Sequence, residues 1–82
     1  MQSQKRLLTE IIGWTGTVLI VAAYMLVSFN ILTAQTTLYH ILNLCGSAGI
    51  LISTLAHRDY QPAVLNTIWA AVALVALIRL WV

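Results

Sequence analysis

Three long runs of apolar residues, separated by two short polar segments, make up most of the chain. The runs are 11–29, 38–56 and 63–82, each about 20 residues long. A helix of that length rises about 30 Å, which is the thickness of the hydrocarbon core of a bilayer. Lipid offers no partner for open backbone groups, and an isolated chain this short cannot close a barrel. The pattern therefore predicts three membrane-spanning helices.

The segments between the runs contain residues typical of helix ends. Segment 30–37 is polar and turn-prone, Thr36 or Thr37 can cap the second helix, and Pro62 suits the first turn of the third. Both connections are short, so neighbouring helices should be antiparallel. We expect an all-α membrane protein: one integral membrane domain over 1–82, folded as a three-transmembrane-helix bundle with short loops.

Composition supports the same class. Hydrophobic residues make up 61% of the chain and charged residues 7%, whereas an ordinary globular domain has about a quarter charged residues. The net charge of +2 arises from four basic and two acidic residues. These are too few and too scattered for a phosphate-binding patch, so we expect the lipid bilayer as a partner and no nucleic acid.

The basic residues predict an orientation. Three spans place the N-terminus and the second loop, with Lys5, Arg6 and Arg58, on one side, and only Arg79 on the other. The positive-inside bias then puts the N-terminus in the cytoplasm of a multi-pass inner (plasma) membrane protein. A cleaved signal peptide is disfavoured, because the first apolar run is too long and Leu32 is large where a small residue is needed.

Each predicted helix carries one polar or small face. On the second helix, polar residues recur at helical spacing from Thr36 to Thr54. Amides within hydrocarbon need hydrogen-bond partners, so they should face protein or a wet cavity. Two interpretations remain open: packing between helices, or a solute cavity. The candidate cavity residues are Asn66, Asn43, Tyr24, Ser47 and Trp69.

Small residues point to close helix contacts. Gly13 and Gly16 on the first helix, with Gly46 and Gly49 on the second, would let two backbones approach each other. Trp69 also has a second interpretation, as an anchor in the membrane interface.

Candidate chemistry is sparse. The sequence contains no Ser, His and acid set, no phosphate-binding glycine loop and no carboxylate pair within a span. His40 and His57 fall near opposite membrane faces, and Cys45 is the single cysteine, which argues against a metal site. Glu10 is interpreted as a solvated residue at the start of the first span. We expect no enzyme activity, no metal and no cofactor.

Three features carry a family resemblance: Ile-Gly-Trp at 12–14, the Asp-Tyr-Gln-Pro turn at 59–62, and Asn66 four residues after that proline. With them the chain resembles the SemiSWEET and PQ-loop superfamily of small bacterial three-helix transporters. It resembles more closely a group of short, uncharacterised bacterial membrane domains, which have an LNLxGS-like second helix (here 42–47) and an LNxIWA-like third helix (here 65–70).

The resemblance to the transporters implies a homodimer of six helices with a solute pocket on its axis, to which Asn66 would contribute. The sequence departs from the family at two places. The Pro-Gln pair of the first helix falls at Leu26 and Val27, and the sugar-packing tryptophan of the second falls near Ile50. The polar faces of the helices lead us to expect a SemiSWEET-like half-transporter for a small polar solute. The missing proline and tryptophan favour the alternative, a non-transporting accessory subunit docked in a larger membrane protein complex.

Overall fold

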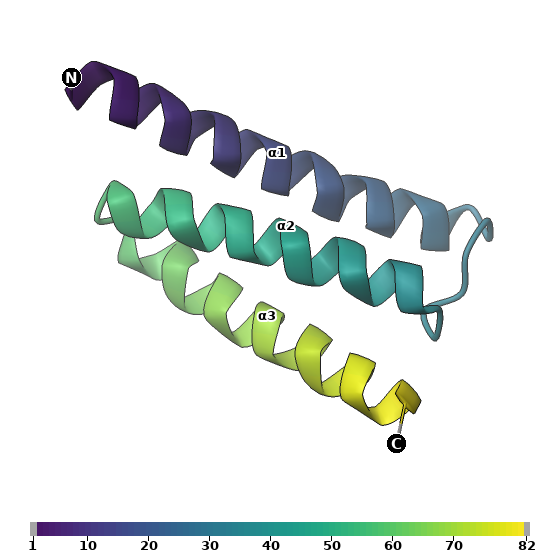
Figure 1. Ribbon diagram of the computed structural model, residues 1–82. Helices are drawn as coiled ribbons and strands as arrows, with labels where there is room; N and C mark the ends of the chain where they lie inside the picture. Colours follow the sequence, from purple (N-terminus) through teal and green to yellow (C-terminus); the bar gives the residue numbers. More distant parts are fainter. Residues whose placement is uncertain (1, 82) are drawn as a thin grey trace.

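A computed structural model describes residues 2–81, which fold into three α-helices (Figure 1). They are α1 (Gln2–Ser28, 27 residues), α2 (Thr37–Ala56, 20 residues) and α3 (Tyr60–Trp81, 22 residues). Each helix is long and apolar enough to cross a membrane, and the described part contains no strand. The predicted all-helical class with three spans is therefore confirmed. Val82, the last residue of the predicted third span, lies outside the described residues.

The helices form an open layer with α2 in the middle (Figure 1). Both α1 and α3 pack on α2, but no Cα atom of α1 lies within 8 Å of one of α3 in residues 2–81. Successive helices run in opposite directions, as the short connections predicted. The N-terminus and the α2–α3 turn therefore lie at one end, and the α1–α2 loop and the C-terminus lie at the other (Figure 1).

Helix α1 begins nine residues before the first predicted span. Segment 2–10 contains neither glycine nor proline, so nothing in it interrupts the helix. Arg6 and Glu10, four residues apart, form an ion pair with Nε and Oε1 at 3.6 Å, a spacing that stabilises a helix modestly. The first turns of α1 thus form a polar extension beyond the apolar run.

Two helices end with a residue in the left-handed backbone conformation. Asn30 follows α1 with φ of 63°, and Arg58 follows α2 with φ of 57°. In both turns two backbone amides bond back to carbonyls of the last turn; after α2, Asp59 N donates to Thr54 O at 2.8 Å and Arg58 N to Leu55 O at 3.1 Å. This is the Schellman arrangement, in which glycine is usual and asparagine is tolerated. Arginine is rare there.

The start of α2 differs in one detail from the prediction. Thr36 occupies the N-cap position with an extended backbone, but its side chain makes no capping hydrogen bond. Its Oγ1 donates to Thr33 O at 2.8 Å, so the hydroxyl stabilises the loop. Pro62 lies in the first turn of α3, as expected.

The interior of the layer is small and polar, and its surface is apolar. Large side chains on every helix, such as Val18, Ile52 and Val72, are more than half exposed. In the part of the chain whose side chains are described, the buried residues are Gly16, Ala23, Asn43, Gly46, Ser47, Ala63, Asn66 and Ala73. A water-soluble protein has the reverse arrangement. Small residues at helix contacts and large apolar residues outside are typical of helices packed in lipid.

Candidate functional site

Helices α1 and α2 meet through the four glycines. A Cβ added to Gly16 would strike the backbone carbonyl of Gly46 and come within 3.0 Å of the Ile50 amide nitrogen. A Cβ on Gly49 would lie 2.9 Å from the Ile12 carbonyl, and one on Gly13 would lie 2.5 Å from the Ser53 hydroxyl. Hydrogen is therefore the only side chain that this contact accommodates without a shift.

Helices α2 and α3 meet through amide and indole groups. Asn43 Nδ2 donates to Tyr39 O at 2.9 Å, and its Oδ1 accepts a hydrogen bond from Trp69 Nε1 at 3.2 Å. Asn66 Nδ2 donates to Pro62 O at 2.8 Å. Asn43 is 4% and Asn66 8% exposed. Since α3 packs only on α2 within residues 2–81, the Asn66 amide is buried against α2.

Ser47 lies one turn beyond Asn43 on α2 and is completely buried. Its Oγ has no hydrogen-bond partner among the described residues. A buried hydroxyl without a partner is unfavourable, although a serine in a helix can rotate its hydroxyl toward a carbonyl of the preceding turn.

The five candidate cavity residues thus separate into two groups. Asn43, Ser47 and Asn66 are buried in the layer, and Trp69 touches Asn43 while remaining 46% exposed. Tyr24 lies on α1, outside the α2–α3 contact, and is 69% exposed. Among the five, the hydrogen bond between Trp69 and Asn43 is the one side-chain contact described.

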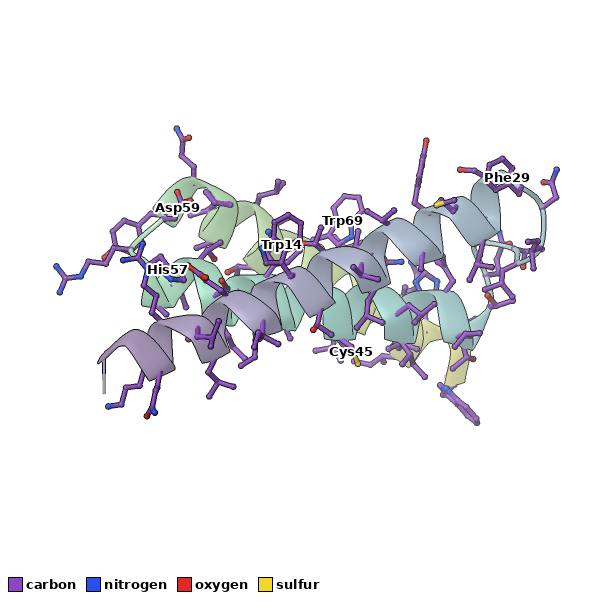
Figure 2. All side chains as sticks on the ribbon, turned by 90° about the horizontal axis from the view of Figure 1, so that it is seen from above. Trp14, Phe29, Cys45, His57, Asp59 and Trp69 are labelled. Carbon is purple, nitrogen blue, oxygen red and sulfur yellow. The ribbon has the colours of Figure 1, made fainter. Side chains whose placement is uncertain are left out.

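The polar concavity lies elsewhere, between α1, α2 and the α2–α3 turn. This α1–α2 groove is open to the surface and has a volume of about 590 Å³. It is lined by Arg6, Glu10, Gly13, Trp14, Thr17, Ile50, Ser53, Thr54, His57 and Asp59. Figure 2 shows Trp14 and Trp69 on one face of the layer and Cys45 on the opposite face.

The α1–α2 groove extends from charged residues to hydrocarbon depth. Glu10 and His57 lie just outside the apolar runs 11–29 and 38–56, whereas Thr17 and Ile50 lie six residues inside them. At 1.5 Å per residue this depth is roughly 10 Å. The groove therefore reaches about one third of the way across a bilayer core of about 30 Å.

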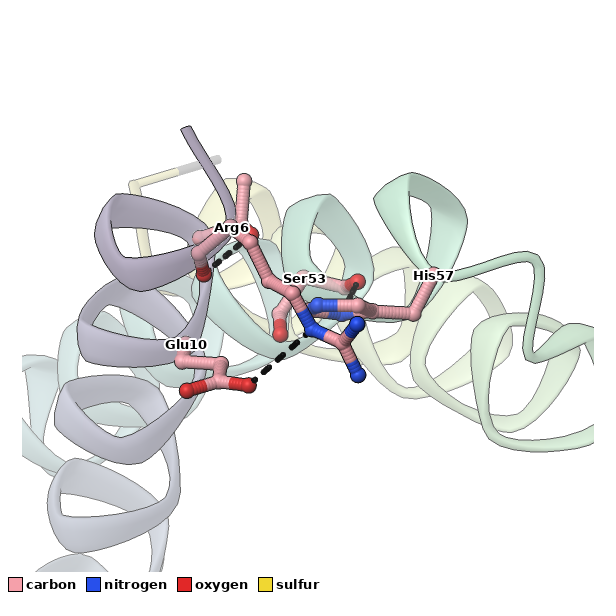
Figure 3. Close-up of polar contacts among 5 residues, drawn as sticks. Arg6, Glu10, Ser53 and His57 are labelled. Carbon is pink, nitrogen blue, oxygen red and sulfur yellow. Dashed lines mark hydrogen bonds and ion pairs between the residues drawn. The ribbon is translucent and has the colours of Figure 1, made fainter. Parts of the chain in front are cut away.

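Three of its polar side chains are bonded to their own helices and keep acceptor sites free. Thr17 Oγ1 donates to Gly13 O at 2.9 Å, and Thr54 Oγ1 donates to Leu51 O at 3.1 Å. His57 Nδ1 lies 2.8 Å from Ser53 O (Figure 3). A carbonyl only accepts hydrogen bonds, so Nδ1 carries the proton. Both threonine oxygens and His57 Nε2, when the ring is neutral, can accept from a ligand.

At the water-facing end, the ion pair of Arg6 and Glu10 borders the groove (Figure 3). Both side chains are largely solvated, at 73% and 49% exposed, so their attraction contributes little to stability. In the described residues no three His, Cys, Asp or Glu side chains lie close enough together to hold a metal ion.

The sequence predicts this groove only when α1 and α2 are aligned with each other, and not from the polar pattern of each helix alone. A short hairpin aligns residues that lie equally far from its loop, so positions of α1 and α2 whose numbers sum to about 66 should be neighbours. The structure pairs Gly13 with Ser53 and Gly16 with Ile50 in this register. The same rule places Thr17 beside Gly49 and Glu10 beside Ala56, and it would have brought Ser53 and His57 to attention.

These features define a class: a small multi-pass membrane protein of three helices, with a glycine contact on one side of α2 and an amide contact on the other. A protein-family model matches residues 9–82, and the chain belongs to that uncharacterised family. No curated protein and no solved structure matches the chain significantly.

Proposed function

We propose that the protein is one half of a membrane transport unit, in which two copies face each other and pass a small polar solute. The α1–α2 groove carries this proposal. Its wall has hydroxyl groups at hydrocarbon depth, and lipid cannot hydrogen-bond to a solute or to a polar wall. A second protein surface would cover the groove, and a copy related by a two-fold axis supplies a wall of the same chemistry.

The position where the groove stops suggests how the path continues. At Ile50 the two helices come together through Gly16 and Gly46, so a solute cannot pass deeper between α1 and α2 of one copy. In the proposed assembly the path therefore continues between copies. Movement of solute past this level would need a change at the interface between copies, since the glycine contact leaves no space within each copy.

The resemblance to SemiSWEET transporters supports pairing of two three-helix units. It also implied that Asn66 contributes to the solute pocket. In a single copy this side chain is bonded to Pro62 O and buried against α2. In our proposal Asn66 holds α3 on α2, and the α1–α2 groove binds the solute.

The proposed orientation has the N-terminus in the cytoplasm and the protein in the plasma membrane. The start of α1 and the α2–α3 turn share one end of the layer (Figure 1). Lys5 and Arg6 belong to the first and Arg58 to the second, whereas Arg79 is in the last turn of α3. The positive-inside bias favours the cytoplasm for the end with three cations. The groove would then open to the cytoplasm.

Uptake into vesicles tests the transport proposal. Purified protein is reconstituted, and uptake of a panel of labelled sugars, polyols and amino acids is compared with protein-free vesicles. We expect one solute class to enter faster. Thr17→Leu should abolish most of this uptake, because it fills the groove and removes a hydroxyl at its deep end.

The matched control is Thr15→Leu, the same change on the same helix at an exposed position that does not line the groove. It should leave uptake near the wild-type rate. The proposal fails if no solute in the panel enters faster than in protein-free vesicles, or if both leucine variants lose uptake equally.

A second candidate function is a non-transporting accessory subunit of a larger membrane protein complex. Hydrogen bonding of Asn43 and Trp69 within one copy favours it, because these groups already hold helices together without a solute. Purification in mild detergent separates the two functions. Elution as a homodimer supports the transporter, whereas constant elution with a larger complex supports the subunit.

A further inference from the structure

We propose that Lys5, Arg6 and Arg58 form a binding site for the phosphate of an anionic phospholipid headgroup. The site lies at the end of the layer where the start of α1 meets the α2–α3 turn. It shares Arg6 and His57 with the water-facing end of the α1–α2 groove, but it does not depend on the proposed transport.

The cations surround a second concavity, of about 630 Å³, which we call the basic pocket. Its walls come from the start of α1 and from the end of α2 with the turn that follows. The lining residues are Lys5, Arg6, Thr9, Ala56, His57 and Arg58. None of these lining residues is a carboxylate. Glu10 pairs with Arg6 through Nε, which leaves the two terminal nitrogens of that guanidinium free to donate to phosphate oxygens.

The depth of the basic pocket matches a headgroup. Lys5 and Arg6 lie one to two turns before the apolar run 11–29, and Arg58 lies two residues after the run 38–56 ends. Three cations therefore lie at the level where phosphates of the adjacent leaflet reside, and basic pockets between helices at this level bind anionic headgroups.

Neighbouring apolar side chains favour a lipid over a free anion. Leu7 and Leu8 on α1, and Leu55 on α2, are each more than half exposed, close in sequence to the three cations. Acyl chains of a bound lipid can pack on these leucines while the phosphate lies among the cations. A soluble phosphate would use the charges alone.

The backbone of Arg58 provides an independent observation. It adopts φ of 57°, a region in which a non-glycine residue is strained by about 1 kcal/mol or more. Glycine would form the same turn without this strain. A cationic side chain at a position better suited to glycine indicates that the guanidinium has a role of its own, which we assign to phosphate binding.

Native mass spectrometry of the full-length protein tests the site. Protein in mild detergent is titrated with phosphatidylglycerol, and in parallel with phosphatidylcholine as the neutral lipid. We expect preferential retention of phosphatidylglycerol. Each cation near the surface is worth about fivefold in affinity, so Lys5→Gln and Arg58→Gln should each lower retention by about that factor, and Arg58→Lys should change it much less.

Two variants separate lipid binding from a structural role. Arg58→Gly should resist unfolding better than wild type, because it relieves the turn, and yet lose about fivefold in phosphatidylglycerol retention. Arg79→Gln removes the same charge at the other end of the layer and should retain lipid like wild type. Equal retention by Arg58→Gly, Arg58→Gln and Arg79→Gln would overturn the proposal.

Inorganic phosphate distinguishes the two sources of the anion. It should displace phosphatidylglycerol poorly even in large excess, because it lacks acyl chains. If phosphate alone binds the delipidated protein with the same dependence on Lys5 and Arg58, and displaces the lipid fully, then the site is a phosphate site and the lipid assignment is wrong.

Discussion

Gly16→Ala should weaken the α1–α2 contact. The new Cβ would strike the Gly46 carbonyl oxygen and lie 3.0 Å from the Ile50 amide nitrogen. Both are backbone atoms of α2, which cannot rotate away as a side chain can. The two helices must therefore separate by about 0.5–1 Å, and a gap of that size loses about a quarter to a half of the dispersion energy of the atoms involved.

The net effect follows from two opposing contributions. Overpacking of a tight contact costs about 1–3 kcal/mol, and alanine recovers up to about 1 kcal/mol through its higher helix propensity. We expect the free energy of unfolding to fall by about 1–2 kcal/mol. Titration with SDS in mixed micelles, followed by tryptophan fluorescence, measures this quantity.

Two variants serve as comparisons. Gly13→Ala would meet only the side chain of Ser53, so part of the clash can be relieved by rotation, and the loss should be smaller. Ala48→Val adds bulk to α2 at an exposed position and should change stability little. If Gly16→Ala unfolds at the wild-type SDS fraction while Ala48→Val is destabilised, the glycines do not determine the α1–α2 contact.

Further predictions concern the α2–α3 contact and are checked by the same SDS titration. Trp69→Phe and Asn43→Ala should show a coupling energy of about 0.6 kcal/mol in a double-mutant cycle, the usual value for a hydrogen bond between membrane helices; strict additivity would mean that the indole and the amide do not interact. Ser47→Ala should leave the free energy of unfolding unchanged or raise it by up to about 1 kcal/mol, because it removes a buried hydroxyl that has no partner. A clear loss of stability in Ser47→Ala would reveal a hydrogen bond of that hydroxyl.

The helices were predictable because length and apolarity determine spans in lipid. Helix ends were predicted correctly where a residue strongly prefers an end position, as Pro62 does in the first turn of α3. The start of α1 was not predicted, because hydropathy detects only the part of a helix that lies within hydrocarbon. Residues 2–10 extend the helix beyond that part and are polar. Thr36 occupies the N-cap position, but its Oγ1 lies toward Thr33 O, to which it donates, and accepts no bond from a first-turn amide.

The central position of α2 could not be derived from loop lengths, since short loops permit α3 to pack on either neighbour. The signal was the presence of two packing faces on one helix. Gly46 and Gly49 meet α1, whereas Asn43 bonds to Trp69 of α3. Helices α1 and α3 each show only one such face, so α2 is the helix that can contact both.

The candidate site was only partly accessible from the sequence. Burial of Asn43 and Asn66 follows from the cost of amides in hydrocarbon. Whether the hydrogen bonds of these two amides are made within one copy depends on how α2 and α3 are rotated relative to each other. The periodicity of the sequence does not determine this rotation. The α1–α2 groove depends in turn on the register between α1 and α2, and a polar pattern on a single helix does not contain that information.

The lone cysteine allows the most direct test of the central claim, that lipid surrounds the layer. Cys45 is exposed and lies midway along α2, so it should be on the protein surface and yet within hydrocarbon. Protein in vesicles is treated with a membrane-impermeant maleimide on both sides of the bilayer, and a Cys45→Ala, Thr33→Cys variant reports the α1–α2 loop. We expect rapid labelling at position 33, and no labelling at Cys45 until SDS dissolves the vesicles. Labelling of Cys45 as fast as position 33 in intact vesicles would contradict the claim.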